Sequence, residues 1–434
     1  MAITTRATLR QMLAQDLNWW RQLTATSAGG ALNKIISTGL NQYDRGQDDA
    51  FNNQWVWETV NASQRLVSDY VTSGGTLTVY AAFAGTITSG GTFELHPYEP
   101  ALLHDCLNDA RDKVYPYIHK RIVDETLVTN NCLPNSHFED WTSSALDHWT
   151  EAGGSTHAEE TTIIRGPKGT SSLKITGGTT TGATCDQGNW IALLDVENAT
   201  LSFYCWAWCA TADKARIQVY TKDSAGTAAT SSSDYHTGGS EWELLKCENV
   251  VIPDDLAIIQ VRLVNTATTA YFDNGYAFAR PLFKYHLPSQ FTRGPVQVFV
   301  QNTGSTSQSA GNADVIDGIS SWLQVFDWDT VDDGVDKYLT FKNTYPTRFK
   351  MKLIGMEPLS SVSTDAGTME VNSRQATAVV AAAAADLFKR LASSPTSDDV
   401  GRYKDLQAMW SNEASQRTME QQMKMPNAIV KGDW

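Results

Sequence analysis

The sequence predicts an α+β multidomain protein, in which helices and small β-sheets flank an inserted all-β segment. Apolar residues recur with helical spacing near both ends of the 434-residue chain. Between residues 129 and 285 the composition turns to Thr, Gly and Trp, and five of the six cysteines fall in this segment. After residue 285 the composition again resembles that of the first segment. We therefore expect an insert within a scaffold, and we divide the chain into residues 1–128, 129–285, 286–360 and 361–434.

The first segment predicts a helix, a small sheet and a second helix, in that order. The first helix is capped by Thr5 or Thr8, and its apolar stripe is Leu9, Leu13, Leu17 and Trp20. Two strand-like runs, residues 65–71 and 76–80, flank Ser73-Gly74-Gly75 and predict a hairpin. After the run 93–96, Pro97 and Pro100 introduce the second helix, which is striped by Leu103, Leu107, Ala110 and Val114.

The last two segments predict a small β-domain and a helical hairpin. Strand-like runs occur at residues 296–300, 322–326, 338–341 and 349–354. The first helix of the hairpin is striped by Val380, Ala384, Leu387 and Leu391, and Pro395 ends it. The second is capped by Thr396 or Ser397 and striped by Val400, Tyr403, Leu406 and Trp410. Beyond Gln416 the stripe fades into a Met-bearing tail with little apolar surface.

Side chains of a β-strand point alternately to its two faces, so the residues on each face can be read from one predicted strand of the insert, residues 201–209. Leu201, Phe203, Cys205, Ala207 and Cys209 point one way and are expected in the core. Tyr204, Trp206 and Trp208 point the other way, where aromatic rings either cover a second apolar layer or stack on a planar ligand. Polar and aromatic residues alternate in the same manner on two further strands, and we expect them to join the aromatic set in one sugar-binding platform: Arg216, Gln218, Tyr220, Gln260 and Arg262.

Composition and charge argue against several classes of function. The net charge is −14, and the insert carries 18 acids against 10 bases, so sequence-specific or backbone binding to nucleic acid is not expected. The first 20 residues lack the apolar core of a secretory signal, and the longest apolar stretch, residues 378–385, is too short to span a bilayer. We expect neither export nor membrane insertion. The cysteines are expected as free thiols in a reducing cytoplasm, and they lack the spacing of a zinc site.

Both flanks resemble the head-tail adaptors, or neck proteins, of tailed bacteriophages. The likeness lies in residues 65–70 and 77–79, in Gly91-Thr-Phe-Glu-Leu-His96 and in the helix that starts near Pro100. The resemblance implies a helical adaptor core, a dodecameric ring, and portal and tail-side neck proteins as partners. It places the protein in the virion neck, assembled in the host cytoplasm. The tail residues that would dock on the portal are Met419, Met423, Met425, Ile429 and Trp434.

The insert resembles the jelly-roll sandwich of carbohydrate-binding modules. Asn131-Cys-Leu-Pro-Asn-Ser-His-Phe-Glu-Asp-Trp141 is similar to the opening strand of that family, and residues 270–278 are similar to its closing strand. The resemblance implies a surface glycan as ligand. It also implies that Glu139 and Asp273 help to hold a structural calcium ion, while no other cofactor is required.

The function predicted is that of a structural virion protein, an adaptor ring with an outward jelly roll that binds glycans. The alternatives are a secreted or surface carbohydrate-binding protein and a glycan-cleaving enzyme. Catalysis is not expected, because no nucleophile elbow, paired metal histidines or phosphate loop occurs. The acidic run 327–336 has the wrong glycine spacing for a helix-loop-helix calcium site and is predicted to be a solvated turn between strands.

Overall fold

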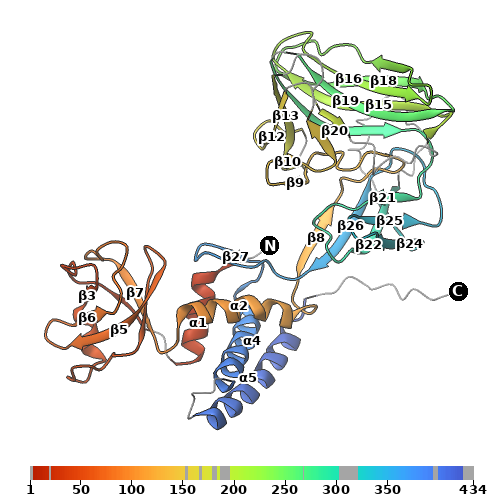
Figure 1. The fold of residues 1–434 in the computed structure, drawn as a ribbon. Coiled ribbons are helices and arrows are strands. Elements are labelled where there is room, and N and C mark those ends of the chain that lie inside the picture. The colour runs from red at the N-terminus through yellow and green to blue at the C-terminus, as the bar shows by residue number, and fades with distance from the viewer. Residues whose placement is uncertain are drawn as a thin grey trace. The chain divides into compact units, whose positions relative to one another are not determined.

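The computed structural model describes residues 3–18, 21–151, 155–165, 169–177, 183–185, 196–266, 268–302, 321–393 and 399–423. These residues form two compact units (Figure 1). Unit 1 takes its residues from 1–120 and 356–425, and unit 2 from 121–355. A long middle segment is thus inserted in a unit built from both flanks. The finer division into four segments stays a prediction.

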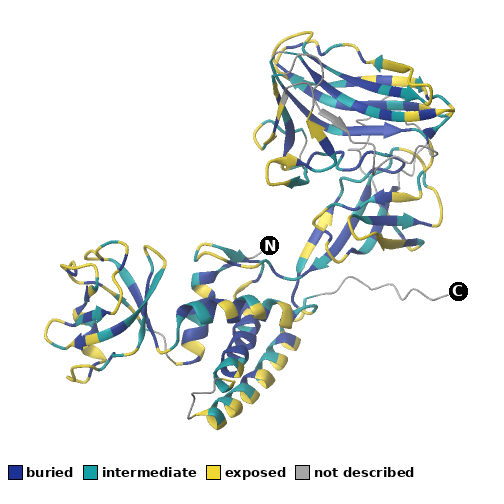
Figure 2. Ribbon diagram, viewed as in Figure 1, coloured by how far each residue is buried: buried dark blue, intermediate teal, exposed yellow. Residues whose placement is uncertain are grey.

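Four helices of unit 1 share one apolar core. They are α1 (Arg6–Asp16), α2 (Pro100–Val114), α4 (Ser373–Ala392) and α5 (Val400–Glu420). The alanine run of α4 is buried, whereas α5 exposes much of its surface (Figure 2). Small side chains let neighbouring helices approach α4 closely, which makes it the centre of the bundle. The predicted helices and the α4–α5 hairpin are confirmed.

Helix caps follow from local hydrogen bonds. Thr5 caps α1, because its hydroxyl accepts from the Thr8 amide at 3.2 Å. Asn372 and Gln375 form a capping box at the start of α4. Asp399 occupies the N-cap position of α5, while the predicted caps Thr396 and Ser397 lie outside the described residues.

Unit 1 also contains a six-stranded sheet in the order β2-β7-β4-β5-β6-β3. Its strands are β2 (Arg21–Thr24), β3 (Lys34–Ile36), β4 (Trp55–Glu58), β5 (Ser63–Val71), β6 (Thr76–Val79) and β7 (Thr92–His96), and the 3-10 helix η1 (Thr38–Gln42) follows β3. The hairpin predicted around Gly74 and Gly75 is β5–β6. Both glycines adopt positive φ, which other residues rarely do.

The two flanks are tied together within unit 1. The short strands β1 (Thr4–Thr5) and β27 (Thr368–Met369) pair, and Asp365 receives hydrogen bonds from Arg6, Arg10 and Trp57. Arg10 is fully buried and also donates to both oxygens of Glu94 on β7. Contacts between residues more than 300 positions apart therefore join the two flanks into one unit.

The larger part of unit 2 is an antiparallel sandwich of two five-stranded sheets. The first sheet has the order β12-β13-β20-β15-β18, with bounds Ser155–Glu160, Ser172–Gly177, Thr269–Phe278, Thr200–Cys209 and Glu241–Val251. The second has the order β11-β14-β19-β16-β17, with bounds Trp149–Glu151, Ala183–Cys185, Leu256–Asn265, Ala215–Asp223 and Ala228–Ser232. Most successive strands cross between the two sheets, as in a jelly roll, whereas β12–β13 and β16–β17 pair within one sheet. The predicted all-β sandwich is confirmed, and Cys205 and Cys209 lie in its core as expected.

A smaller β part completes unit 2. It contains the three-stranded sheet β21-β25-β24 (Lys284–His286, Lys337–Phe341, Trp328–Asp332) and the four-stranded sheet β23-β22-β26-β8 (Ser321–Val325, Pro295–Asn302, Met351–Glu357, Lys120–Asp124). A separate apolar cluster holds these sheets together. Residues 328–332 of the acidic run form β24, and residues 333–336 form the turn that leads to β25, so the expected turn is confirmed only for the second part of the run. The two-stranded pair β9 (Trp141–Thr142) and β10 (Ala145–Leu146) lies at the start of the sandwich.

None of the described helices has the length and apolar character needed to cross a lipid bilayer.

Candidate functional site

The outer face of the first sheet carries a row of aromatic side chains. Trp242, Trp208 and Tyr271 are neighbours across β18, β15 and β20 by strand register. The rings of Trp208 and Tyr271 meet edge to face, with centroids 5.1 Å apart. The two tryptophans remain partly exposed. We call these three residues the aromatic row.

Trp206 lies beside this row, and a cation covers it. The guanidinium carbon of Arg165 is 3.4 Å from the centre of the Trp206 ring. The backbone amide of Arg165 also donates to Oδ2 of Asp273 at 2.9 Å. One face of Trp206 is therefore already occupied by a side chain of the protein itself.

Tyr204 belongs to an internal contact of unit 2, so its prediction as a ligand-binding residue is wrong. It is 3% exposed and packs with Val128, Tyr276 and Phe278. Its hydroxyl donates to Glu248 at 2.6 Å and accepts from Arg348 at 2.8 Å. The small β part supplies Arg348 and thereby covers the end of the sheet where Tyr204 lies. Strand alternation places a side chain on an outer face but does not reveal what covers that face.

The outer face of the second sheet carries polar residues in register on two neighbouring strands. Gln218 pairs with Arg262 and Tyr220 pairs with Gln260 across β16 and β19. Arg216 is two positions before Gln218 on the same face. We call Arg216, Gln218, Tyr220, Gln260 and Arg262 the polar face.

Cation–aromatic stacking and hydrogen bonds order the polar face. Arg262 stacks on Tyr220 with 3.8 Å between the guanidinium carbon and the ring centre, and its Nη2 donates to Oε1 of Gln260 at 2.9 Å. Gln218, which is 7% exposed, accepts from Nη2 of Arg216 at 3.0 Å when its amide oxygen faces that residue. Burial lowers the pKa of Arg262. Nε of Arg262 is buried and has no acceptor among the described residues.

The polar face is also positively charged. The outward positions 216–222 of β16 and 258–264 of β19 carry Arg216, Lys222 and Arg262 but no acid. This local excess contrasts with the net charge of −14 of the whole chain. An anion or a group rich in hydrogen-bond acceptors is the ligand that such a surface complements.

The predicted single platform is wrong, because its members lie on opposite outer faces of the sandwich. Trp206 and Trp208 belong to β15 in the first sheet, whereas the five polar-face residues belong to β16 and β19 in the second. The apolar core lies between the two sheets. Alternation of side chains along each strand was sufficient to find the outward residues. The sheet to which a strand belongs depends on its pairing with strands that are distant in sequence.

Glu139 and Asp273, the predicted calcium ligands, both contact the segment 165–171. Glu139 accepts from the Thr170 and Ser171 amides at 2.9 and 3.2 Å, and Asp273 accepts from the Arg165 amide at 2.9 Å. Burial raises the pKa of Asp273 to about 7, with a contribution from the charge of Glu139. The two carboxylates are thus close enough to repel each other. Glu139 also borders a cavity of about 520 Å³ with Asp124, Glu125 and Asp140.

The predicted portal-docking residues have different environments. Met419 is 67% exposed near the end of α5. Met423 is partly buried against the helical core of unit 1, and its amide donates to the Tyr117 carbonyl at 2.8 Å, so it is not a free side chain of the tail. It was predicted to be free because the helical stripe fades near it, but the turn after α5 brings it back to the bundle. Met425, Ile429 and Trp434 lie outside the described residues.

Sequence reasoning missed three aromatic residues of these faces. Trp242 and Tyr271 complete the aromatic row, and Tyr235 stacks with Arg216 at 4.6 Å. Alternation along β18 and β20 signals that Trp242 and Tyr271 point outward. Tyr235 follows the end of β17, and no local pattern marks it.

An inserted antiparallel β-sandwich with two differently built outer faces is the class of module that this geometry defines. Comparison with protein-family models found no match, and comparison with curated proteins found none. Among solved structures, the chain is similar to the C-terminal family 22 carbohydrate-binding module of Clostridium thermocellum Xyn10B, with 20% identity, a TM-score of 0.27, and coverage of 31% of this chain and 87% of that one.

Two further solved structures are similar over about a third of the chain. The CBM22-1 xylan-binding domain of Paenibacillus barcinonensis Xyn10C gives 15% identity, a TM-score of 0.28, and coverage of 37% of this chain and 96% of that one. The enzymatically active domain of bacteriophage CBA120 tailspike protein 4 gives 13% identity, a TM-score of 0.27, and coverage of 35% and 22%. TM-scores of this size do not establish a common fold or ligand. The resemblance of the flanks to head-tail adaptors stays a prediction.

Proposed function

We propose that the sandwich is a glycan-binding module and that the polar face is its binding surface. The observation that carries the proposal is an ordered set of cationic and amide donors on an outer face, where Arg262 stacks on Tyr220 and donates to Gln260. Because these side chains are already held in place, a ligand that binds them would immobilise few of them.

The residues around Arg262 suit a sugar chain. Sugar hydroxyls accept from guanidinium groups and both donate to and accept from amides, which Gln218 and Gln260 supply. The rings of Tyr220 and Tyr235 are covered by the guanidinium groups of Arg262 and Arg216, and this stacking holds the two donors in place. Because the face is cationic, we propose that glycans with uronic acids bind more tightly than neutral ones.

The test is a glycan array with the full-length protein, followed by calorimetric titration of the best oligosaccharide. Arg262→Gln removes the charge and the Nε donor, and Tyr220→Ala removes the ring beneath the guanidinium. Each is expected to weaken binding about tenfold or more, which corresponds to one lost charge-assisted hydrogen bond. Trp208→Ala on the aromatic row is the matched control and should leave the affinity unchanged. Loss of binding in Trp208→Ala alone would move the site to the first sheet, and no binding by any glycan would refute the function.

We also propose that Glu139 and Asp273 contribute to a structural calcium site. The two carboxylates suit a cation because they lie close together and both carry negative charge. Asp273 is 2% exposed, and both accept hydrogen bonds from residues between 165 and 171. A bound cation would offset the cost of burying their charge. Calcium should raise the melting temperature of the sandwich, and Glu139→Gln should abolish that increase while leaving the fold intact by circular dichroism. Equal calcium responses in the variant and the wild type would contradict the proposal.

A second proposal concerns unit 1, which we propose to be the adaptor part of a virion protein. Its support is the construction of one unit from both flanks, together with the exposed Met409 and Met419 on α5. In this role, identical units form a ring that contacts the portal and a tail-side neck protein. The adaptor role implies that the protein is assembled in the host cytoplasm and lies in the virion neck.

Electron microscopy of the protein with the portal encoded in the same genome tests the adaptor role. We expect rings on portal particles, and we expect fewer of them when residues 424–434 are deleted. Met419→Ser should weaken attachment, whereas Met423→Ser should first destabilise unit 1, because only Met423 packs in its core. Full-length protein that stays monomeric and does not bind portals would refute this proposal without affecting the glycan-binding one.

A further inference from the structure

Two histidines and an aspartate from three separate segments of unit 2 meet at one point. The ligand atoms of His148, His286 and Asp336 all lie within 4.8 Å of one another. The two imidazole rings are 4.2 Å apart between centroids and nearly perpendicular, and Nε2 of His286 is 3.1 Å from Oδ1 of Asp336. All three side chains are partly buried.

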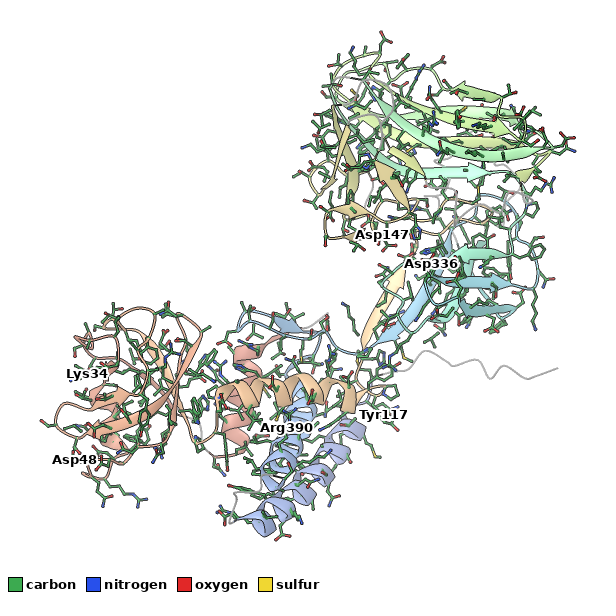
Figure 3. All side chains as sticks on the ribbon, viewed as in Figure 1. Lys34, Asp48, Tyr117, Asp147, Asp336 and Arg390 are labelled. Carbon is green, nitrogen blue, oxygen red and sulfur yellow. The ribbon has the colours of Figure 1, made fainter. Side chains whose placement is uncertain are left out.

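The fold brings these residues together from two parts of unit 2. His148 lies in the turn between β10 and β11 of the sandwich, next to Asp147, which Figure 3 labels together with Asp336. His286 is the last residue of β21, and Asp336 immediately precedes β25 in the small β part. Strand pairing places His286 opposite Tyr338, two residues after Asp336. The position of Asp336 beside His286 is therefore set by the sheet itself.

The turn that carries Asp336 is ordered by its own hydrogen bonds. The Asp333 carboxylate accepts from the amides of Val335 and Asp336 at 3.0 and 2.8 Å. The Tyr338 ring packs edge to face on His286 with 5.7 Å between centroids. Two of the three side chains are thus held in place by elements of the small β part before any ligand arrives.

The chemistry of the three groups is that of a transition-metal site. Imidazole nitrogen and carboxylate oxygen are ordinary zinc ligands, and a site with three protein ligands keeps the fourth position for water. A cavity of about 40 Å³ is bordered by His286, Asn135 and Asp140, and it has room for such a water. Zinc bonds of about 2.0–2.2 Å put ligand atoms roughly 3.4 Å apart in a tetrahedral site, so groups now up to 4.8 Å apart would have to move about 1 Å closer together.

We propose that His148, His286 and Asp336 bind a divalent transition-metal ion, with zinc preferred, which links the sandwich to the small β part. The ion would replace the direct hydrogen bond between His286 and Asp336 and add a bond to His148 from the other part. Its role is structural, because a metal joining two parts of the chain favours the folded state over the unfolded one. The proposal is independent of glycan binding, whose residues lie on β16 and β19.

The test uses the full-length protein after removal of metals with EDTA. Zinc titration followed by calorimetry should give one site per chain and an increase in the melting temperature. Cobalt(II) should give the intense visible d–d bands of tetrahedral coordination without a thiolate charge-transfer band. The absence of that band excludes binding by the cysteines of the sandwich.

Two variants identify the ligands. His148→Asn should weaken zinc binding at least tenfold, and Asn tolerates the positive φ of 68° at this position. Asp336→Asn should weaken it similarly, while its amide oxygen still accepts from His286 and keeps the fold. Asp147→Asn is the matched control, because it removes a neighbouring charge without removing a member of the cluster, and zinc binding should be nearly unchanged.

The outcomes are distinct. Zinc binding that both ligand variants abolish supports the site. No zinc binding by the wild type, or binding that neither variant weakens, overturns it and leaves a His286–Asp336 hydrogen bond with a second imidazole packed edge to face. If His148→Asn fails to fold without metal, Asp336→Asn still decides the question by the cobalt spectrum.

Discussion

Removing one partner of the buried ion pair between Arg10 and Glu94 should strongly destabilise unit 1. Both side chains are fully buried, and Arg10 donates to both Glu94 oxygens, at 2.9 and 3.1 Å. Arg10 also donates to Asp365 at 2.7 Å and lies 4.8 Å above the Trp57 ring. The perturbation we choose is Arg10→Met, which keeps the length of the side chain but removes its charge and its donors.

The structure sets the expected magnitude. Removing one partner of a buried ion pair costs about 3–5 kcal/mol, because the remaining charge stays buried and unpaired. Hydrogen bonds from His96 and Gln11 would still reach Glu94 and reduce that cost, whereas loss of the Asp365 bond and the Trp57 contact would increase it. We expect a loss of roughly 4 kcal/mol, equivalent to about 10 °C in the melting temperature for a unit of this size.

The assay is hydrogen exchange followed by mass spectrometry, together with calorimetry. Peptides from α1 and β7 should exchange faster in Arg10→Met, while peptides from β15 in unit 2 should not change. Arg402→Met is the matched control, because Arg402 is exposed on α5 and its loss should have little effect. The double variant Arg10→Met/Glu94→Leu should recover stability, since no buried charge remains. Wild-type exchange in α1 and a wild-type melting temperature in Arg10→Met would show that this ion pair does not stabilise unit 1 against loss of one partner.

Three further predictions concern pH, backbone geometry and an internal contact. Burial raises the pKa of Glu94, but hydrogen bonds from His96 and Arg10 and the charge of Arg10 outweigh it and lower the pKa to about 2 from 4.5. The stabilisation is therefore present above pH 4.5 and should be lost as the pH falls towards 2, which thermal melts of the wild type and of Glu94→Gln will show; equal acid sensitivity in both would contradict it. Gly75→Ala should destabilise the β5–β6 hairpin by roughly 1 kcal/mol more than Gly74→Ala, because a Cβ at Gly75 would lie 2.1 Å from a backbone oxygen whereas one at Gly74 meets nothing closer than 3.8 Å. Tyr204→Phe should cost about 1–3 kcal/mol in denaturant melts through its two lost hydrogen bonds and leave glycan affinity unchanged; a weaker affinity would return Tyr204 to the binding site.

Local elements could be located from the order of residues alone. Stripes at three- and four-residue spacing were sufficient to find the helices α1, α2, α4 and α5, since the period of the helix appears directly in the order of residues. The glycines at 74 and 75 located a hairpin, because the turn needs positive φ. Alternation likewise assigned Cys205 and Cys209 to the core of the sandwich and the polar-face residues to an outer surface.

Long-range contacts in the folded chain determine which outward surfaces lie on the same face and which of them are covered. Trp208 and Tyr220 both point outward, but β15 and β16 pair into different sheets, so the two residues cannot contact one ligand. Tyr204 points outward and is nevertheless buried, because Arg348, 144 positions away, lies over it. No sequence motif links the three residues of the proposed zinc site, which are His148, His286 and Asp336. They come together only in the folded unit. The physical reason is common to all three cases: local patterns record the conformation of a segment, whereas a site is made by contacts between segments that are distant in sequence.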